Sequence, residues 1–218
     1  MKMNLNELET RILGCLMEKE LTTPENYPLS LNALVSACNQ KSNRDPVMSL
    51  TESELVSGLQ SLGSRGLARL TTTGGRVGKY CHSVAGKLGL AAPTRAILAE
   101  LMLRGPQTVG ELRNRCERMA EFSDLAAVEA LLLELRQCGP PLVATLPRLA
   151  GRKEQRYAQL FAGQPDLPEQ EAPAMEKQGG RQALGNQRLL MLEAEVGTLR
   201  DEICTLRQDI EALLAPFV

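Results

Sequence analysis

The sequence predicts a mainly helical protein with small β-hairpins, built from one structural unit that occurs twice and followed by a C-terminal coiled-coil helix. Three observations support this fold class. The string ILGCLM at 12–17 returns as ILAELM at 97–102, strand-like residues follow the helical part of each copy, and apolar residues recur every three or four positions after residue 189. We therefore expect four segments, at residues 1–86, 87–163, 164–186 and 187–215.

Composition excludes several classes of protein. The 218 residues include 25 Lys and Arg against 26 Asp and Glu, and only 3% are aromatic. These values argue against a uniformly basic nucleic-acid coat protein and against single-strand binding by aromatic stacking. The apolar runs are too short to span a membrane and the N-terminus lacks a signal-peptide pattern, so we expect a cytoplasmic protein. Six scattered Cys and one His predict no disulfide framework, no metal site and no cofactor.

The net charge of −1 is the sum of two unlike parts of the chain. Residues 1–163 carry twenty basic and sixteen acidic side chains, a net charge of +4, whereas residues 164–218 carry five and ten, a net charge of −5. The two parts are therefore predicted to be separate modules.

Each copy of the repeat begins with two predicted helices. The first helix carries the repeated strings, with Ile12 matching Ile97 in amphipathic patterns. The second helix begins after Ser30 in one copy and after Thr108 in the other, because both residues are good N-caps. Thr108 is followed three positions later by Glu111, which is the signature of a capping box.

A third helix completes the helical part of each copy. It is predicted from Thr51, with a capping box to Glu54, as far as Gly66, and its counterpart ends before Gly139. A hairpin follows each third helix, from strands at 67–73 and 76–84 and from strands at 142–146 and 155–161. Three helices and a hairpin are the winged-helix arrangement, so we predict two tandem winged-helix domains.

The C-terminal segment has the pattern of a parallel two-stranded coiled coil. After a Pro- and Gly-rich linker at 164–186, β-branched residues fill three of four predicted a positions and Leu fills every d position. Three predicted g to e pairs, such as Glu195 with Arg200, have opposite signs, which favours a homodimer over a helix that folds back onto the body. The dimerisation residues are Leu189, Leu192, Val196, Leu199, Ile203, Leu206, Ile210 and Leu213.

The strings PENYPLSLNALVSACNQKSNRDPV, GLARLTTTGGRVGKYCH and PPLVATLPR resemble the YceH-like family of uncharacterised bacterial proteins. The similarity runs over roughly residues 5–163, and NQKSNRDPV is its most specific string. The resemblance implies a tandem winged-helix fold and a bacterial source, but it implies no activity and no catalytic or ligand-binding residue.

The predicted function is binding of double-stranded DNA by a protein that resembles a transcription regulator. The third helix of a winged-helix domain enters the major groove, and polar or basic residues around it contact bases and phosphates. The candidate contacts are Asn39, Gln40, Lys41, Asn43, Arg44, Ser57, Gln60, Ser61, Ser64, Arg65, Arg76, Lys79, Arg148, Arg152, Lys153 and Arg156.

Protein interaction is the alternative function, because winged helices also serve as protein-binding modules. The third helix of the second copy is apolar almost all round, so we expect it to be buried on several sides, against the first copy, a second subunit or another protein. Separately, the NQKSNRDP string can be interpreted as a hydrogen-bonded structural loop and not as a DNA contact, with Asp45 pairing with Arg44 or capping a turn.

The sequence does not predict an enzyme. His82 is the only imidazole, and its neighbour Cys81 lies on the opposite face of a predicted strand, so the two do not form a nucleophile and base pair. The glycine-rich string at 74–78 lacks the ending and the following helix that a phosphate-binding loop needs.

Overall fold

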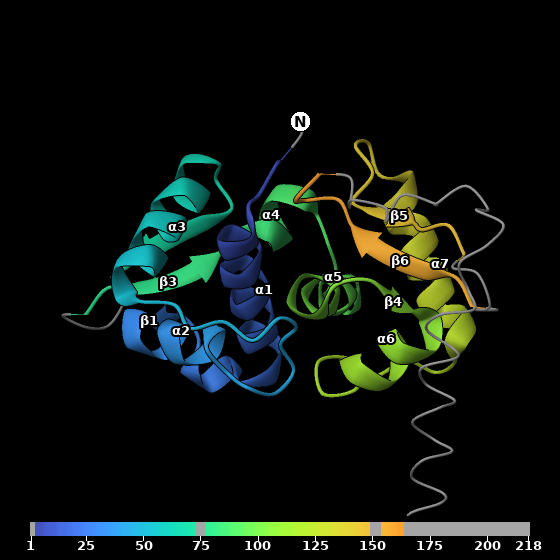
Figure 1. Cartoon of the computed structure of the whole chain (residues 1–218), viewed down its shortest axis with the longest axis horizontal. Helices are drawn as coiled ribbons and strands as arrows, with labels where there is room; N and C mark the ends of the chain where they lie inside the picture. Colours follow the sequence, from blue (N-terminus) through green and yellow to red (C-terminus); the bar gives the residue numbers. More distant parts are fainter. Residues whose placement is uncertain (1–2, 73–76, 149–153, 164–218) are drawn as a thin grey trace, which may run out of the picture. The chain divides into compact units, whose positions relative to one another are not determined.

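The same succession of helices and strands occurs twice along the chain (Figure 1). The structure is a computed structural model that describes residues 3–72, 77–148 and 154–163. The first repeat contains α1 (Glu7–Thr22), the 3-10 helix η1 (Pro24–Asn26), β1 (Leu29–Ser30), α2 (Leu31–Cys38), α3 (Glu52–Ser64), β2 (Ala68–Thr71) and β3 (Lys79–His82). After α4 (Val84–Leu88), the second contains α5 (Ala92–Arg104), β4 (Gln107–Thr108), α6 (Val109–Cys116), α7 (Leu125–Gln137), β5 (Val143–Thr145) and β6 (Arg156–Gln159).

Local capping residues set the starts of the helices. Ser30 accepts a hydrogen bond from Ala33 N at 3.3 Å, and it begins α2 as predicted. The capping boxes predicted from Thr51 and from Thr108 are both present, at the starts of α3 and α6. A further capping box, which was not predicted, begins α1 from Asn6.

Each repeat also contains a small antiparallel sheet. The strand order is β1-β3-β2 in the first sheet and β4-β6-β5 in the second, so the predicted hairpins are β2–β3 and β5–β6. The strands β1 and β4 were not predicted. Each has only two residues and pairs with the second strand of its hairpin, far along the chain.

The core is continuous between the two repeats because α1 packs directly against α5. Ile12, Leu16, Ile97 and Leu101 are fully or almost fully buried. The backbones come close at Gly14, where an added Cβ would lie 3.0 Å from the Cβ of Met102. Figure 1 shows the two helices crossing between α3 and α7.

The described residues confirm a mainly helical fold with small antiparallel sheets. The predicted linker at 164–186 and the predicted coiled coil at 187–215, with its eight seam residues, lie outside the described residues. In the part of the chain that the structure describes, no helix is long and apolar enough to cross a bilayer.

Candidate nucleic-acid interface

The outer face of α3 presents small polar side chains. The inner face buries Leu55 and Leu62 against the core, which leaves Ser57, Gln60 and Ser64 exposed on the other side of the helix. These three residues are predicted DNA contacts, and the structure brings them together on one face. Short hydroxyl side chains let a helix approach another surface closely, and an exposed amide can both donate and accept hydrogen bonds.

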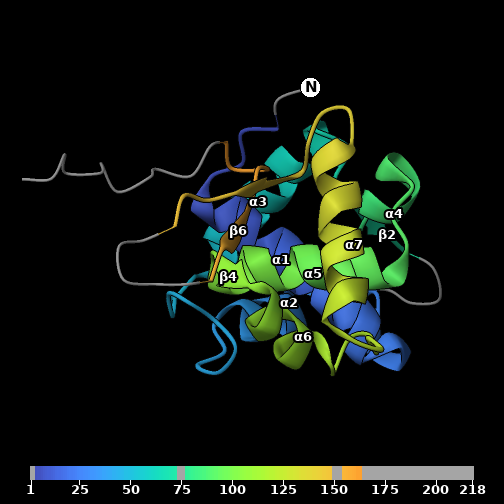
Figure 2. The same cartoon turned by 90° about the vertical axis from the view of Figure 1, so that its right-hand side faces the viewer.

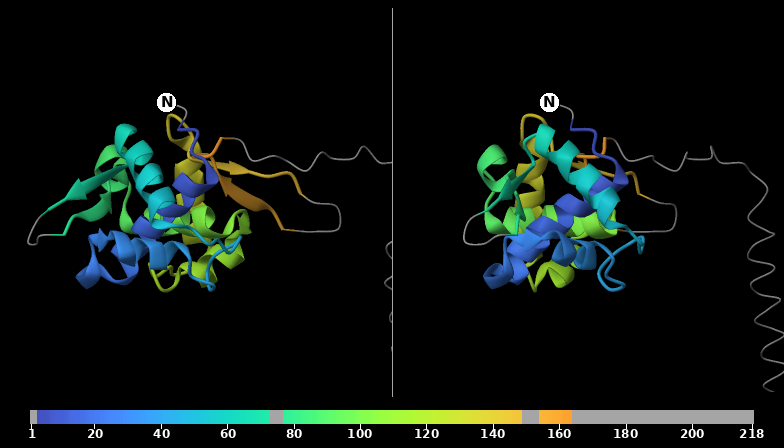
Figure 3. Two further views of the ribbon diagram at one scale, coloured as in Figure 1. Left: turned by 60° about the vertical axis from the view of Figure 1, so that its left-hand side comes forward. Right: turned by 90° about the vertical axis from the view of Figure 1, so that its left-hand side faces the viewer.

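The β2–β3 hairpin lies beside α3 and carries exposed cations. Strand pairing places Lys79 opposite Thr71 and Arg69 opposite Cys81, on the same face of the hairpin. Figure 3 shows this hairpin projecting away from the helices, on the side opposite to β5–β6. Arg69, whose Nε donates to Cys81 Sγ at 3.1 Å, is an exposed cation that was not among the predicted contacts. The only sequence signal for it is the alternation of ARLT, which places Arg69 on the same side as Thr71.

The predicted contact Arg44 lies inside the protein. Its guanidinium donates to both carboxylate oxygens of Glu18, from Nη1 at 3.1 Å and from Nη2 at 2.5 Å. It also donates to the carbonyl oxygen of Ala37 at 2.9 Å and to the side chain of Gln40 at 3.0 Å. Because none of its side chain is exposed, Arg44 is not available to a phosphate group, and Gln40 is engaged with it.

The rest of the loop at residues 39–50 is held by its own hydrogen bonds. The Asn39 amide donates to Leu50 O at 2.8 Å and accepts from Leu50 N at 2.7 Å, which closes the loop. Asn43 accepts from Arg104 Nη1 at 3.3 Å. These contacts agree with the alternative reading of NQKSNRDP as a structural loop, although Arg44 pairs with Glu18 and not with Asp45.

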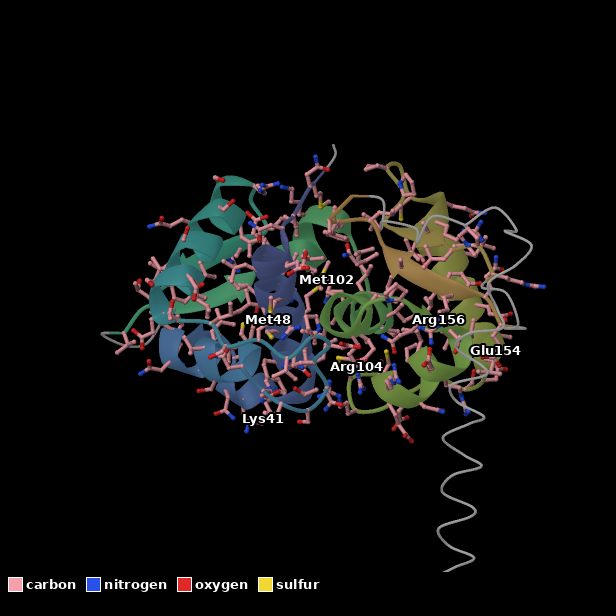
Figure 4. All side chains as sticks on the ribbon, in the orientation of Figure 1. Lys41, Met48, Met102, Arg104, Glu154 and Arg156 are labelled. Atoms are coloured by element: carbon pink, nitrogen blue, oxygen red, sulfur yellow. The ribbon has the colours of Figure 1, made fainter. Side chains whose placement is uncertain are left out.

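Lys41 is the one candidate of this loop that stays free among the described residues. Its side chain is exposed and has no hydrogen bond or ion pair within the described part of the chain. Figure 4 shows it beyond α2, on the side away from α3. The structure therefore does not bring Lys41 together with Gln60 and Lys79.

The same loop connects the two repeats. Asp45 N donates to Leu103 O of α5 at 2.9 Å, and Arg118, after α6, donates to Glu18 at 2.5 Å. Burial alone would raise the pKa of Glu18, but the hydrogen bond and charge of Arg44 and the charge of Arg118 outweigh it and lower that pKa. Glu18 is thus an ionised centre shared by both repeats.

Two further candidates on α3 are engaged with the N-terminal residues. The hydroxyl of Ser61 donates to the carboxylate of Glu9. Arg65, at the end of α3, donates to the carbonyl oxygen of Met3 and lies 3.6 Å from Glu9. Their contacts hold α1 and α3 together and leave less of Arg65 for an external ligand.

The candidates of the second repeat are spread along its hairpin. Arg148 is exposed, whereas Arg156 donates to Pro106 O at 2.9 Å and to Glu111 at 3.3 Å. Figure 4 shows Arg156 on β6. The remaining candidates of the two hairpin tips, Arg76, Arg152 and Lys153, lie outside the described residues.

The helix α7 departs from expectation. Val128, Leu132 and Leu135 are buried, but Leu125 and Leu133 are 48% and 49% exposed. Within the described part of the chain this helix is therefore not buried on several sides, and its burial against a second subunit or another protein stays a prediction. Its main contacts are with α5, α6 and β5 of its own repeat.

His82 has a structural place in the first repeat. Its Nδ1 accepts from Val84 N at 3.2 Å, so Nε2 carries the hydrogen and donates to Glu20 Oε2 at 2.9 Å. Arg95 of α5 lies 3.0 Å from the same carboxylate oxygen. Burial lowers the pKa of His82, and Glu20 offsets this only in part. Among the described residues, no group of three or more His, Cys, Asp or Glu side chains could hold a metal ion.

Comparison with known proteins places the chain among bacterial relatives. A family model described as "Protein of unknown function, DUF480" matches residues 5–152. A "UPF0502 protein" of Citrifermentans bemidjiense is 60% identical over 225 residues, covering all of both chains. A "UPF0502 protein" of Geotalea uraniireducens is 65% identical over 202 residues, covering 92% of each chain, and one of Pelobacter propionicus is 52% identical over the whole of both chains.

Proposed function

This chain belongs to the DUF480 family of bacterial UPF0502 proteins, whose function is unknown, and from that premise we propose that its first repeat binds double-stranded DNA. The resemblance to the YceH-like family is confirmed by this membership. The observation that carries the proposal is the position of the polar outer face of α3 beside a hairpin with exposed Arg69 and Lys79.

The proposal treats both repeats as winged-helix domains. The order helix, strand, helix, helix, strand, strand in each repeat supports this assignment, as does the antiparallel sheet that joins the short strand to the hairpin. On this basis α3 takes the position of the helix that enters the major groove, and β2–β3 is the wing.

The contacts to DNA are shared between α3 and its hairpin. Gln60 reads a base edge, since a Gln amide matches the donor and acceptor of adenine in the major groove. Ser57 and Ser64 permit close approach to the groove, and Ser57 donates to a phosphate oxygen. The hydroxyl of Ser64 is already used, because it donates to Ser61 O at 2.8 Å. Arg69 and Lys79 contact the phosphate backbone beside the helix. Arg44 has no part in this surface, because its guanidinium is buried with Glu18.

We further propose that the predicted coiled coil makes the protein a homodimer. Two first repeats in one dimer raise the apparent affinity for a duplex through effective concentration. The gain matters here because the proposed phosphate contacts of the described first repeat include only two cations, Arg69 and Lys79, so each domain binds DNA weakly.

Titration of the full-length protein with a pool of duplex DNA tests the proposal. Binding is expected at low salt and to weaken steeply as salt rises, because phosphate contacts release counterions. The change Lys79→Ala is expected to weaken binding to all sequences and to reduce the salt slope by about 1. Lys41→Ala is the matched control, since it removes the same charge from an exposed Lys that lies away from α3.

Two results contradict the proposal. Absence of binding at low salt rejects DNA as the ligand. Equal losses in Lys79→Ala and Lys41→Ala reject the hairpin as the contact and leave only a diffuse attraction between the basic body and DNA.

A second candidate function is favoured by one specific observation. Leu133 lies on the outward face of α7 and is 49% exposed. Exposed apolar side chains that share one helix face mark sites of protein interaction. We therefore propose protein interaction as the role of the second repeat, which is compatible with DNA binding by the first.

A further inference from the structure

The helix α7 occupies the place in the second repeat that α3 occupies in the first. A shift of 73 residues superimposes their buried positions. The pairs are Leu55 with Val128, Leu59 with Leu132, and Leu62 with Leu135, and all six side chains are buried. The same shift therefore identifies which outward positions of the two helices correspond.

The outward positions have diverged in character. Ser57 and Gln60 of α3 correspond to Ala130 and Leu133 of α7, and all four residues are exposed. Figure 2 shows α7 on the outer side of the second repeat, in front of α5. Because α3 keeps the same fold with polar residues at these positions, the fold itself does not require apolar ones on α7.

Acidic side chains lie on both sides of this apolar stripe. At 100° per residue around the helix, Glu129 and Glu134 flank the line from Ala130 to Leu133. Both are exposed, and neither forms an ion pair within the part of the chain that the structure describes. Asp124, which caps α7, adds a third carboxylate at its start. The exposed Arg136 lies on the same side of the helix as Glu129, so the face carries three carboxylates and one guanidinium, and its net negative charge disfavours phosphate groups.

We propose that α7 docks a basic amphipathic helix of a partner protein. A partner helix with apolar residues at i, i+3 or i+4, and i+7 covers the stripe, and Lys or Arg on both sides of its apolar line pair with Glu129 and Glu134. This inference rests on the second candidate function and is independent of DNA binding by α3.

The two parts of the surface have different roles. Covering Leu133 and Ala130 supplies the affinity, because burial of apolar surface is the main favourable contribution to association. The glutamates select the partner, since exposed ion pairs contribute little affinity while like charges oppose docking. One helix face is smaller than a standard interface, so the complex is weak and sensitive to salt.

A synthetic peptide of about three heptads tests the partner chemistry. It carries Leu at the a and d positions and Lys or Arg at e and g, so that repulsion prevents it from pairing with itself. Fluorescence anisotropy of the labelled peptide, titrated with the full-length protein, measures binding. Two further peptides keep the same Leu positions, one with Glu and one with Gln at e and g. We expect the basic peptide to bind at least tenfold more tightly than either.

Charge reversal on α7 separates this site from general electrostatics. The double change Glu129→Lys and Glu134→Lys is expected to abolish binding of the basic peptide and to give binding of the acidic one. The matched control is Glu25→Lys with Glu52→Lys, which makes the same change in net charge at exposed positions of the first repeat. This control variant is expected to bind the basic peptide within twofold of the parent protein.

Each other outcome overturns a defined part of the inference. Equal binding of the basic and Gln peptides keeps α7 as a protein-docking face but rejects a basic partner. Loss of binding in the control variant to the same extent rejects α7 as the site, and no binding of any peptide rejects docking of a helix there. If Leu133→Ser lowers the sedimenting mass of the full-length protein, the occupant is a second copy of this chain.

Discussion

At the scale of single residues, the interior of the protein contains an unusual set of charges where the two repeats meet. Arg44, Glu18 and Arg118 form a connected group of ion pairs. Glu100 lies beside them with no exposed surface, and neither of its carboxylate oxygens accepts a hydrogen bond from a described residue. Burial favours the neutral form of both glutamates, but the partners of Glu18 outweigh it and those of Glu100 do not, so Glu18 is ionised and the pKa of Glu100 is raised.

Replacing Arg44 tests whether the loop that contains it is structural. The change Arg44→Ala leaves Glu18 buried without its one fully buried partner, and only Arg118 and the more distant Lys19 remain. We therefore expect the free energy of unfolding to fall by about 3 kcal/mol or more. Urea unfolding followed by circular dichroism measures this. The neighbouring Lys41→Ala is the control and is expected to stay within about 0.5 kcal/mol of the parent. Similar small effects of both changes contradict a structural role for Arg44.

Glu100 predicts a specific dependence of stability on pH. Burial raises its pKa, and the charges of Arg104 and Arg118 lower it only in part. The folded state therefore binds the proton of Glu100 more tightly than the unfolded state does. The stability that protonated Glu100 contributes is fully present below the pKa of the unfolded state and is lost as pH rises through the pKa of the folded state. Relative to the parent protein, Glu100→Gln is expected to gain stability as pH increases from 4 to 8.

Glu111 is the matched control for this dependence. Burial alone would raise its pKa, but hydrogen bonds from Thr108 and the charges of Arg156 and Arg115 lower it. Its contribution to stability is present above the unfolded pKa, so Glu111→Gln is expected to lose stability relative to the parent as pH rises over the same range. Parallel trends for the two variants in urea unfolding contradict the assignment of opposite pKa shifts.

At the scale of elements, the repeats depend on very close helix packing. An added Cβ at Gly58 of α3 would lie 2.6 Å from Ile12 Cδ1 of α1, whereas one at Gly63 of the same helix meets nothing closer than 3.8 Å. The two glycines lie on the same helix but have different neighbours. Alanine substitutions at the two positions therefore distinguish the effect of helix propensity from the effect of packing.

Alanine at these two positions is expected to have effects of opposite sign. Gly58→Ala gains helix propensity but overpacks the α1–α3 contact, so we expect a net loss of about 1 to 2 kcal/mol. Gly63→Ala makes only an ordinary van der Waals contact, 3.8 Å from Ala68 O, and is expected to stabilise the protein by up to about 1 kcal/mol. Thermal and urea unfolding measure both. Stabilisation by Gly58→Ala contradicts close packing at Ile12.

Elements were predictable from the sequence where the deciding interactions are local. The N-caps at Ser30, Thr51 and Thr108 follow from residues within three positions, and the predicted helices begin there. The strands β1 and β4 were missed because two residues carry no periodicity and their partners are distant. Arg44 was assigned to the surface because its partner Glu18 lies 26 residues away.

At the scale of the whole molecule, the two proposed surfaces lie on opposite sides of the described repeats. Figure 1 shows α3 and α7 separated by α1 and α5, and Figure 3 shows the hairpins projecting in opposite directions. One chain therefore cannot place both third helices on the same side of a duplex. This arrangement agrees with different ligands for the two repeats, as their outward residues also indicate.

The predicted coiled coil bears on the oligomeric state of the protein. We expect sedimentation of the full-length protein to give twice the 23.8 kDa mass of one chain. A chain that ends at Gly163 is expected to sediment as a monomer. Leu199→Lys, on the predicted seam, is expected to separate the dimer, whereas Thr198→Lys, off the seam, is not. A single-chain mass for the full-length protein contradicts the coiled coil.

The shared core of α1 and α5 also affects how the chain folds during its synthesis. Ile12 and Ile97 are both fully buried, yet the second is synthesised 85 residues after the first. At about 5 to 20 residues per second, the ribosome releases α1 roughly 4 to 17 s before the helix that covers it. During this interval the newly made first repeat exposes the apolar face of α1 that α5 later covers. This is therefore the period in which the nascent chain most needs a chaperone.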